Sequence, residues 1–149
     1  MNYKIALYIR ASTEEQSINP EGTIKNQEDR LRGFITQKNS QENFGKTVSV
    51  FVDRAKSGKD FNRPELRNLI KAIESGEVNL VLVTELSRLS RSVKDFAGLW
   101  DLMREHKCSF MSLRESFDTT NAAGEMMIFS IMNFPNLKES RPQRELRPI

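Results

Sequence analysis

Short apolar runs alternate along the chain with longer stretches in which apolar residues recur every three or four positions. Runs of the first kind predict buried strands, and stretches of the second kind predict amphipathic helices. The strands are expected at residues 3–9, 48–52, 79–84 and 109–113. Strands that alternate with helices predict an α/β fold, with a mostly parallel sheet of four to five strands and helices on both faces.

Polar residues mark where the predicted helices begin and end. The first helix is expected at residues 21–37. The second starts at Pro64, because proline is favoured in the first turn, and ends at Gly76, which suits the left-handed position after a helix. The third starts after Ser92, whose hydroxyl suits a helix cap, with Asp95 in the capping-box position.

A fourth helix is expected at about residues 122–134, and it is apolar on nearly every side. Such a helix is either deeply buried or forms a subunit interface. Pro135 then breaks the helical pattern, because proline lacks the N–H that a helix needs. The composition of residues 135–149, rich in proline, arginine and glutamate, predicts disorder. We therefore divide the chain into a domain at residues 1–134 and a tail at residues 135–149.

The composition is that of one globular domain. A chain of 149 residues with 38% hydrophobic and 29% charged residues is long enough to bury a core of ordinary size. No apolar run approaches the length of a membrane span and no signal peptide is visible, so a cytoplasmic protein without a membrane partner is expected. The single cysteine, Cys108, excludes an internal disulfide and is expected to be a small buried residue.

The net charge of +3 is unevenly distributed. Residues 135–149 hold four basic and two acidic side chains, which gives +2 and leaves +1 for the other 134 residues. The domain is therefore not a general binder of polyanions, and any affinity for DNA must come from local clusters of charge.

The first predicted strand ends in a pair of residues suited to phosphate chemistry. Arg10 and Ser12 are two apart, so in a strand they share a face. The carboxyl ends of parallel strands are where open α/β folds bind ligands. A guanidinium offers a planar, permanently charged fork to anionic oxygens, and the neighbouring hydroxyl is a candidate nucleophile.

Further arginines follow the second and third predicted strands. Arg63 precedes the helix at Pro64, and Arg88 follows the run Val81-Leu82-Val83. Arg91 is three residues after Arg88, so in a helical turn the two would lie on one face. We expect these arginines and the one at the first strand end to surround an anion such as sulfate or phosphate, because their charges would otherwise repel one another.

Three motifs occur in a specific order: Tyr8-Ile9-Arg10-Ala11-Ser12-Thr13, then Ser57-Gly58 with Arg63-Pro64, then Arg88-Leu89-Ser90-Arg91-Ser92. Together they resemble the catalytic domain of the serine site-specific recombinases, the family of the resolvases, the invertases and the large serine integrases. The resemblance covers roughly residues 3–134. The long connection at residues 13–26 and the Arg-Leu-Ser-Arg-Ser stretch are similar to those of the large members.

The resemblance implies a function on DNA. In this family a serine attacks the phosphodiester and stays linked to the 5′ phosphate, so rejoining needs no ATP and no cofactor is expected. Ser12 matches that nucleophile, and DNA is the implied partner, with dimers that form a tetramer in the active complex. The chain is expected to be a truncated catalytic domain that lacks its DNA-binding region. The other matching positions are the arginines Arg10, Arg63, Arg88 and Arg91 and the supporting residues Gln27 and Asp53.

Two features depart from the family pattern. Ser87 stands where many members have an acidic residue before the first arginine of the pair, although Glu85 is close by in sequence. Residues 135–139 read Pro-Asn-Leu-Lys-Glu, where members continue the helix with a sequence such as Gln-Phe-Glu-Arg-Glu. One nucleotide sequence encodes both when its reading starts two bases later, so we interpret residues 135–149 as a frameshifted tail.

Two other interpretations come from different classes of function. One is a non-catalytic dimerisation module that regulates a full-length recombinase by forming mixed dimers. The other, a flavodoxin-like nucleotide-binding or receiver domain, would need an acidic pocket or a phosphate-binding loop. Gly45-Lys46-Thr47 lacks the first glycine of such a loop, where Ser40 stands, and a strand follows it. Metal catalysis is not favoured either, because His106 is the sole histidine of the chain.

Overall fold

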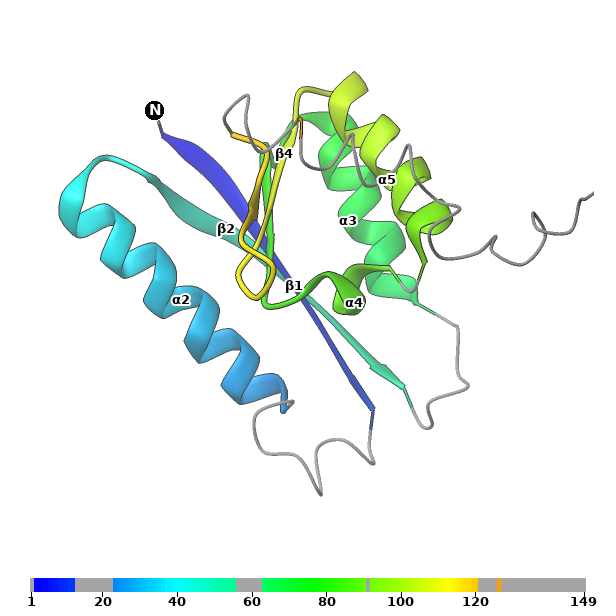
Figure 1. Ribbon diagram of the computed structural model, residues 1–149, viewed down its shortest axis with the longest axis horizontal. Helices are drawn as coiled ribbons and strands as arrows, with labels where there is room; N and C mark the ends of the chain where they lie inside the picture. The colour runs from blue at the N-terminus through cyan, green and yellow to red at the C-terminus, as the bar shows by residue number, and fades with distance from the viewer. Residues whose placement is uncertain (1, 13–22, 56–62, 91, 121–125, 127–149) are drawn as a thin grey trace, which may run out of the picture.

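The computed structural model describes residues 2–12, 23–55, 63–90, 92–120 and 126, which form a five-stranded sheet flanked by helices (Figure 1). The strands lie in the order β2-β1-β3-β4-β5. The first four run parallel, and β5 pairs antiparallel with β4. Their bounds are Tyr3–Ser12 for β1, Gly45–Ala55 for β2, Leu80–Val83 for β3, Ser109–Ser112 for β4 and Phe117–Asp118 for β5. The prediction of a mostly parallel α/β sheet is confirmed.

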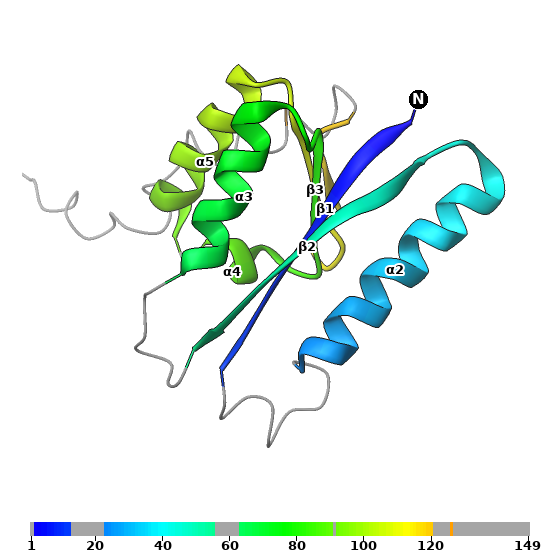
Figure 2. The same ribbon diagram turned by 180° about the vertical axis from the view of Figure 1, so that it is seen from behind.

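Helices cover both faces of the sheet, as predicted. Figure 1 and the reverse view in Figure 2 show α2 against one face and α3 and α5 against the other. The short helix α4 follows β3 and packs with α3 and α5, since its Leu89 belongs to their core cluster. The helix bounds are Ile24–Gln41 for α2, Pro64–Ser75 for α3, Leu86–Leu89 for α4 and Val93–Glu105 for α5.

The alternation of side chains along β1 divides the core into two clusters. Ile5, Leu7 and Ile9 pack on the α2 side, while Ala6 and Tyr8 pack on the side of α3 and α5. All five side chains are fully buried. Burying one isoleucine or leucine side chain stabilises a fold by about 1.5–3 kcal/mol. Packing on both faces therefore fixes the central strand, and with it the position of its carboxyl end.

The end of α3 and the start of α5 follow the sequence signals, whereas α2 spans Ile24–Gln41 rather than residues 21–37. Gly76 ends α3 with a φ of 84°, in the left-handed region that favours glycine. The Ser92 hydroxyl accepts a hydrogen bond from the Asp95 backbone N–H at 3.0 Å and so caps α5. Cys108 is buried, and burial raises the pKa of its thiol to about 12. These local predictions are confirmed.

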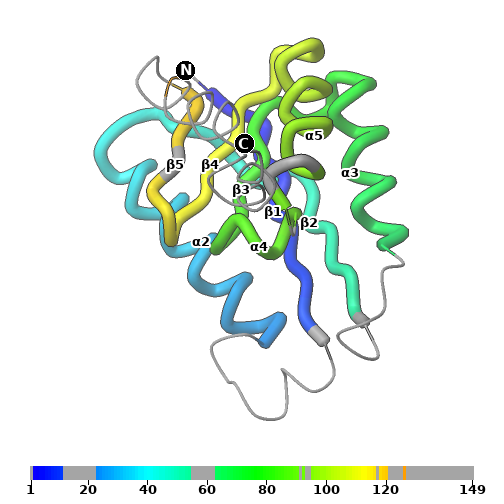
Figure 3. Tube along the Cα trace, turned by 45° about the vertical axis from the view of Figure 1, so that its right-hand side comes forward, coloured from blue at the N-terminus to red at the C-terminus, as the bar shows by residue number. Residues whose placement is uncertain are grey.

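The first two strands are longer than the apolar pattern predicts. β1 and β2 pair along their whole length, up to the partners Ser12 and Ala55, whereas β1 pairs with β3 over Ile5–Leu7. The carboxyl ends of β1 and β2 therefore project past β3 as a two-stranded ribbon (Figure 3). Polar residues are frequent at the carboxyl ends of β1 and β2, so a prediction from apolar runs ends each strand too early.

Two short elements, α4 and β5, are not predicted, because four and two residues are too few to show a period. The helical turn expected to carry both Arg88 and Arg91 ends at Leu89, and Ser90 is extended, with φ −150° and ψ 144°. The expectation of a shared helical face is therefore wrong. Arg91 itself lies outside the described residues.

The last part of the chain stays at the level of prediction. Of the predicted helix at residues 122–134, the structure describes Met126 alone, which is helical and 67% exposed. Residues 121–125 and 127–149 lie outside the described residues, and with them the frameshifted tail and its boundary at residue 134. Within the described part of the chain, no helix combines the length and the apolar character needed to cross a membrane.

Candidate active site

The ends of neighbouring strands bring the candidate residues to one edge of the sheet. Arg10 lies two residues before the end of β1, and the strand register places Asp53 of β2 beside it. β3 stops at Val83, and the chain then forms α4, which carries Arg88. Because β1 continues past the end of β3, α4 packs against the projecting part of β1.

The backbone carbonyl of Arg10 accepts hydrogen bonds from two distant side chains. Gln27 of α2 donates from Nε2 at 3.1 Å, and Arg88 of α4 donates from Nη1 at 3.0 Å. Gln27 is fully buried, and Arg88 is 9% exposed. These bonds fix the strand two residues before Ser12, for which the structure describes the backbone only.

Asp53 joins the end of β2 to the start of α3. Its Oδ1 accepts the backbone N–H of Glu65 at 2.9 Å, and its Oδ2 accepts that of Leu66 at 3.0 Å. The N-cap residue of α3, Arg63, makes no side-chain capping bond, so Asp53 satisfies amide groups that a helix start leaves unpaired. Its negative charge also lies at the positive end of the helix dipole. Asp53 therefore holds α3 on the sheet.

Tyr8 connects Asp53 with Arg63. Its hydroxyl donates to Oδ2 of Asp53 at 2.7 Å and accepts from Nη2 and Nε of Arg63 at 3.0 and 3.2 Å. Burial raises the pKa of the Tyr8 hydroxyl above its ordinary value, and the bond to Asp53 raises it further, against the opposing effect of Arg63. Tyr8 therefore stays protonated and donates to the carboxylate at neutral pH.

Arg63 extends this network to α4. Its Nη2 donates to the backbone carbonyl of Arg88 at 2.7 Å, and its guanidinium lies 5.4 Å from the centre of the Tyr8 ring. Arg63 thus binds the backbone of Arg88, and Arg88 in turn binds the backbone of Arg10. The structure therefore links three of the four predicted arginines by direct contacts.

An arginine cluster of this kind is a candidate anion site, and its binding of an anion stays a prediction. Neighbouring guanidinium groups repel one another, and a negative charge among them relieves the repulsion. The carboxylate of Glu85 is one such charge, since its Oε2 lies 3.5 Å from Nε of Arg88. Guanidinium groups that backbone contacts hold in place are preorganised to stabilise charge that develops on a phosphate.

The contacts show where the predicted residues lie, and their catalytic roles stay predictions. Arg10, Gln27 and Arg88 share one carbonyl, and Asp53 joins Arg63 through Tyr8. Tyr8 belongs to the first sequence motif but is not among the predicted site residues. A signal for it was present, because a tyrosine inside an otherwise aliphatic buried strand needs a partner for its hydroxyl.

The sequence of this chain matches the family described as "Resolvase, N terminal domain" over residues 5–145. Two curated relatives are DNA-invertases from Salmonella abortus-equi and Salmonella typhimurium, each 34% identical, over 128 and 126 residues. These matches cover 86% and 85% of this chain, and 56% and 55% of the relatives. This chain therefore spans about half the length of the curated relatives that it matches.

Two solved structures have the same fold. The N-terminal catalytic domain of TP901-1 integrase has a TM-score of 0.75 and 34% identity, over 87% of this chain and 91% of that chain. A resolvase family site-specific recombinase from Streptococcus pneumoniae has a TM-score of 0.72 and 25% identity, over 89% and 84%. The fold of this chain is thus of the recombinase type. The chain belongs to the resolvase N-terminal domain family.

Proposed function

We propose that this chain cleaves and rejoins DNA strands by transesterification at Ser12, as the catalytic domain of a site-specific recombinase. The observation that carries the proposal is the convergence of Gln27 and Arg88 on the carbonyl of Arg10, two residues before the nucleophile. These bonds fix the strand end and bring a guanidinium to it. The names of the similar proteins, DNA-invertase and integrase, support DNA as the substrate.

In the proposed reaction, the Ser12 oxygen forms a bond to phosphorus while the bond from phosphorus to the 3′ oxygen breaks. The serine hydroxyl loses its proton, the 3′ oxygen takes up one proton to leave as a hydroxyl, and the 5′ phosphate stays on the serine. One phosphodiester replaces another, so the strand can be rejoined without ATP. Arg10, Arg63, Arg88 and Arg91 stabilise the charge on the five-coordinate phosphorus, because charged forks bind phosphate oxygens strongly.

Detection of the phosphoserine intermediate tests this function. In a chimera, residues 1–134 of this chain replace the matching segment of the Salmonella typhimurium DNA-invertase, which supplies the remaining part and its own DNA site. Quenching with detergent should trap protein bound covalently to the 5′ end of the cut strand. Mass spectrometry should find the nucleotide on the peptide that contains Ser12. A chimera that binds the site and forms no covalent species would overturn the proposal.

The same experiment distinguishes the non-catalytic module. A regulatory module would inhibit the unmodified invertase by forming mixed dimers, and would not become attached to DNA itself. Adding increasing amounts of the 149-residue chain to the invertase measures this inhibition directly. Inhibition together with a chimera that forms no adduct would favour the module over the enzyme.

We also propose that the chain associates with itself through the apolar segment at residues 122–134. At ~25 cal/mol per Å² of apolar area, leaving several of its side chains in water would cost a few kcal/mol. Sedimentation over a range of concentrations should show a weak dimer. Phe129→Asp should raise its dissociation constant at least about 10-fold.

A matched control for this prediction is Val48→Asp. Val48 is also apolar and 40% exposed, but it lies on β2. This variant should leave the dissociation constant unchanged. A protein that is monomeric at every concentration would contradict the proposed interface, and the proposed tetramer on DNA would then lack its dimer.

A further inference from the structure

The helix that carries Arg88 consists of a single turn. α4 contains the four residues Leu86–Leu89. One helical turn is unstable by itself, because its formation fixes several dihedral angles for a single hydrogen bond. The position of Arg88 therefore depends on tertiary contacts. Leu89, which is 1% exposed, supplies one of them by packing in the core.

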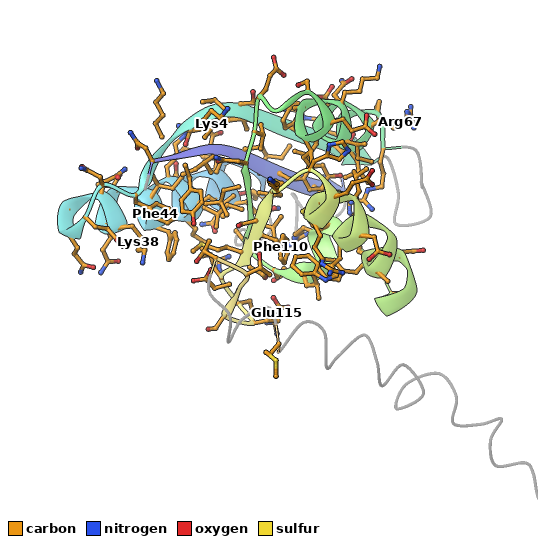
Figure 4. The ribbon with its side chains drawn as sticks, turned by 90° about the horizontal axis from the view of Figure 1, so that it is seen from above. Lys4, Lys38, Phe44, Arg67, Phe110 and Glu115 are labelled. Atoms are coloured by element: carbon orange, nitrogen blue, oxygen red, sulfur yellow. The ribbon has the colours of Figure 1, made fainter. Side chains whose placement is uncertain are left out.

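The turn at residues 113–116, between β4 and β5, supplies another contact. Oε1 of Glu115 accepts the backbone N–H of Leu86 at 3.0 Å and also the hydroxyl of Ser112. Leu86 is the first residue of α4, so Glu115 satisfies one of the amide groups that the helix start leaves open. Glu115 is labelled in Figure 4, on the β4–β5 hairpin. The hairpin therefore anchors the backbone of α4.

Glu85, the residue before α4, lies between two arginines. Its Oε2 is 3.5 Å from Nε of Arg88 and accepts the Ser87 hydroxyl at 3.2 Å. Its Oε1 accepts from Nη1 of Arg114, in the β4–β5 turn, at 3.3 Å. At 3.5 Å the contact with Arg88 is an ion pair rather than a hydrogen bond.

Burial distinguishes the two ion pairs of Glu85. The side chains of Glu85 and Arg88 are 20% and 11% exposed, whereas that of Arg114 is 71% exposed. Solvent and salt screen an exposed pair, which typically contributes little, and screen a shielded pair much less. The carboxylate therefore acts mainly on Arg88, and Arg114 has the smaller effect.

We propose that Glu85 is a positioning residue that holds the guanidinium of Arg88 for the phosphate. The inference rests on the proposed function, in which Arg88 acts on the scissile phosphodiester. Glu85 lies against Nε, and the carbonyl of Arg10 binds Nη1, so the planar fork is fixed at two points. A fork held in this way loses little conformational freedom when an anion binds.

The first test is the NMR signal of the Arg88 Nε–H group in the ¹⁵N-labelled 149-residue chain, assigned by its absence in Arg88→Lys. Glu85→Gln removes the charge and keeps the size, so this signal should shift and exchange faster with solvent. Ser87→Ala, which removes a donor to the same carboxylate, should shift it in the same direction by less. Arg114→Ala should leave it in place. An unchanged Arg88 signal in both the Glu85 and the Ser87 variants overturns the proposal.

The second test is the rate of adduct formation in the chimera. Because misplacement of a group at the reacting centre is costly, Glu85→Gln should lower this rate about 10- to 100-fold with the same affinity for DNA. A shifted Arg88 signal with an unchanged rate would overturn the role of Glu85 in the reaction. If the unmodified chimera forms no adduct, the proposed function fails by itself, and the NMR signal still decides whether Glu85 holds Arg88.

Discussion

Replacing Asp53 with alanine is expected to lower the free energy of unfolding by about 3–5 kcal/mol. Asp53 is 3% exposed, and its carboxylate accepts hydrogen bonds from the Tyr8 hydroxyl and from two backbone N–H groups of α3. Alanine would leave these donors without their acceptor, and each such loss costs about 1–3 kcal/mol. Thermal unfolding followed by circular dichroism should show a midpoint roughly 10 °C lower.

Three other variants separate the contributions to this loss. Tyr8→Phe removes one donor and should cost about 1–2 kcal/mol. Asp53→Asn keeps an acceptor but removes the charge, so its effect should lie between those of Tyr8→Phe and Asp53→Ala. Arg67→Ala changes an exposed residue of α3 (Figure 4) and should cost less than about 0.5 kcal/mol. An Asp53→Ala effect as small as that of Arg67→Ala would show that the carboxylate does not hold the helix.

The features that the sequence predicts well are those set by neighbours along the chain. Pro64 and Gly76 bound α3, and Ser92 caps α5, because propensity and capping depend on residues within one turn. The two-sided burial of β1 follows in the same way from its continuous apolar run. These local signals are enough to predict how strands and helices alternate along the chain. The alternation in turn predicts that the site lies at the carboxyl edge of a parallel sheet.

The contacts that organise the site join residues far apart in sequence. Tyr8 and Asp53 are 45 residues apart, and Leu86 and Glu115 are 29 residues apart. Nothing in the pattern around either residue indicates its partner, since both pairs depend on how the strands align. The end of α4 at Leu89 carries no such signal either, because neither glycine nor proline follows it in the sequence. The arginines are therefore predictable as candidates, whereas the groups that hold them are not.

Replacing Ser12 with alanine should abolish the covalent protein–DNA species in the chimera. Alanine removes the oxygen that attacks phosphorus, so the rate of adduct formation should fall by more than about 1,000-fold. Strand β1 should persist, because Ser12 pairs with Ala55 through the backbone, and this pairing does not need the serine hydroxyl. The adduct is measured by gel electrophoresis in detergent after incubation with DNA that is labelled on the 3′ side of the cut.

The control variant for this result is Ser40→Ala, which removes an exposed hydroxyl at the far end of α2. It should form the adduct at the normal rate, and both variants should bind DNA and unfold at the same temperature as the unmodified chimera. Under these conditions, loss of the adduct in the Ser12 variant alone identifies the nucleophile. Normal adduct formation by Ser12→Ala would mean that another group attacks the phosphate. The bonds to the Arg10 carbonyl would then fix the strand without presenting a nucleophile.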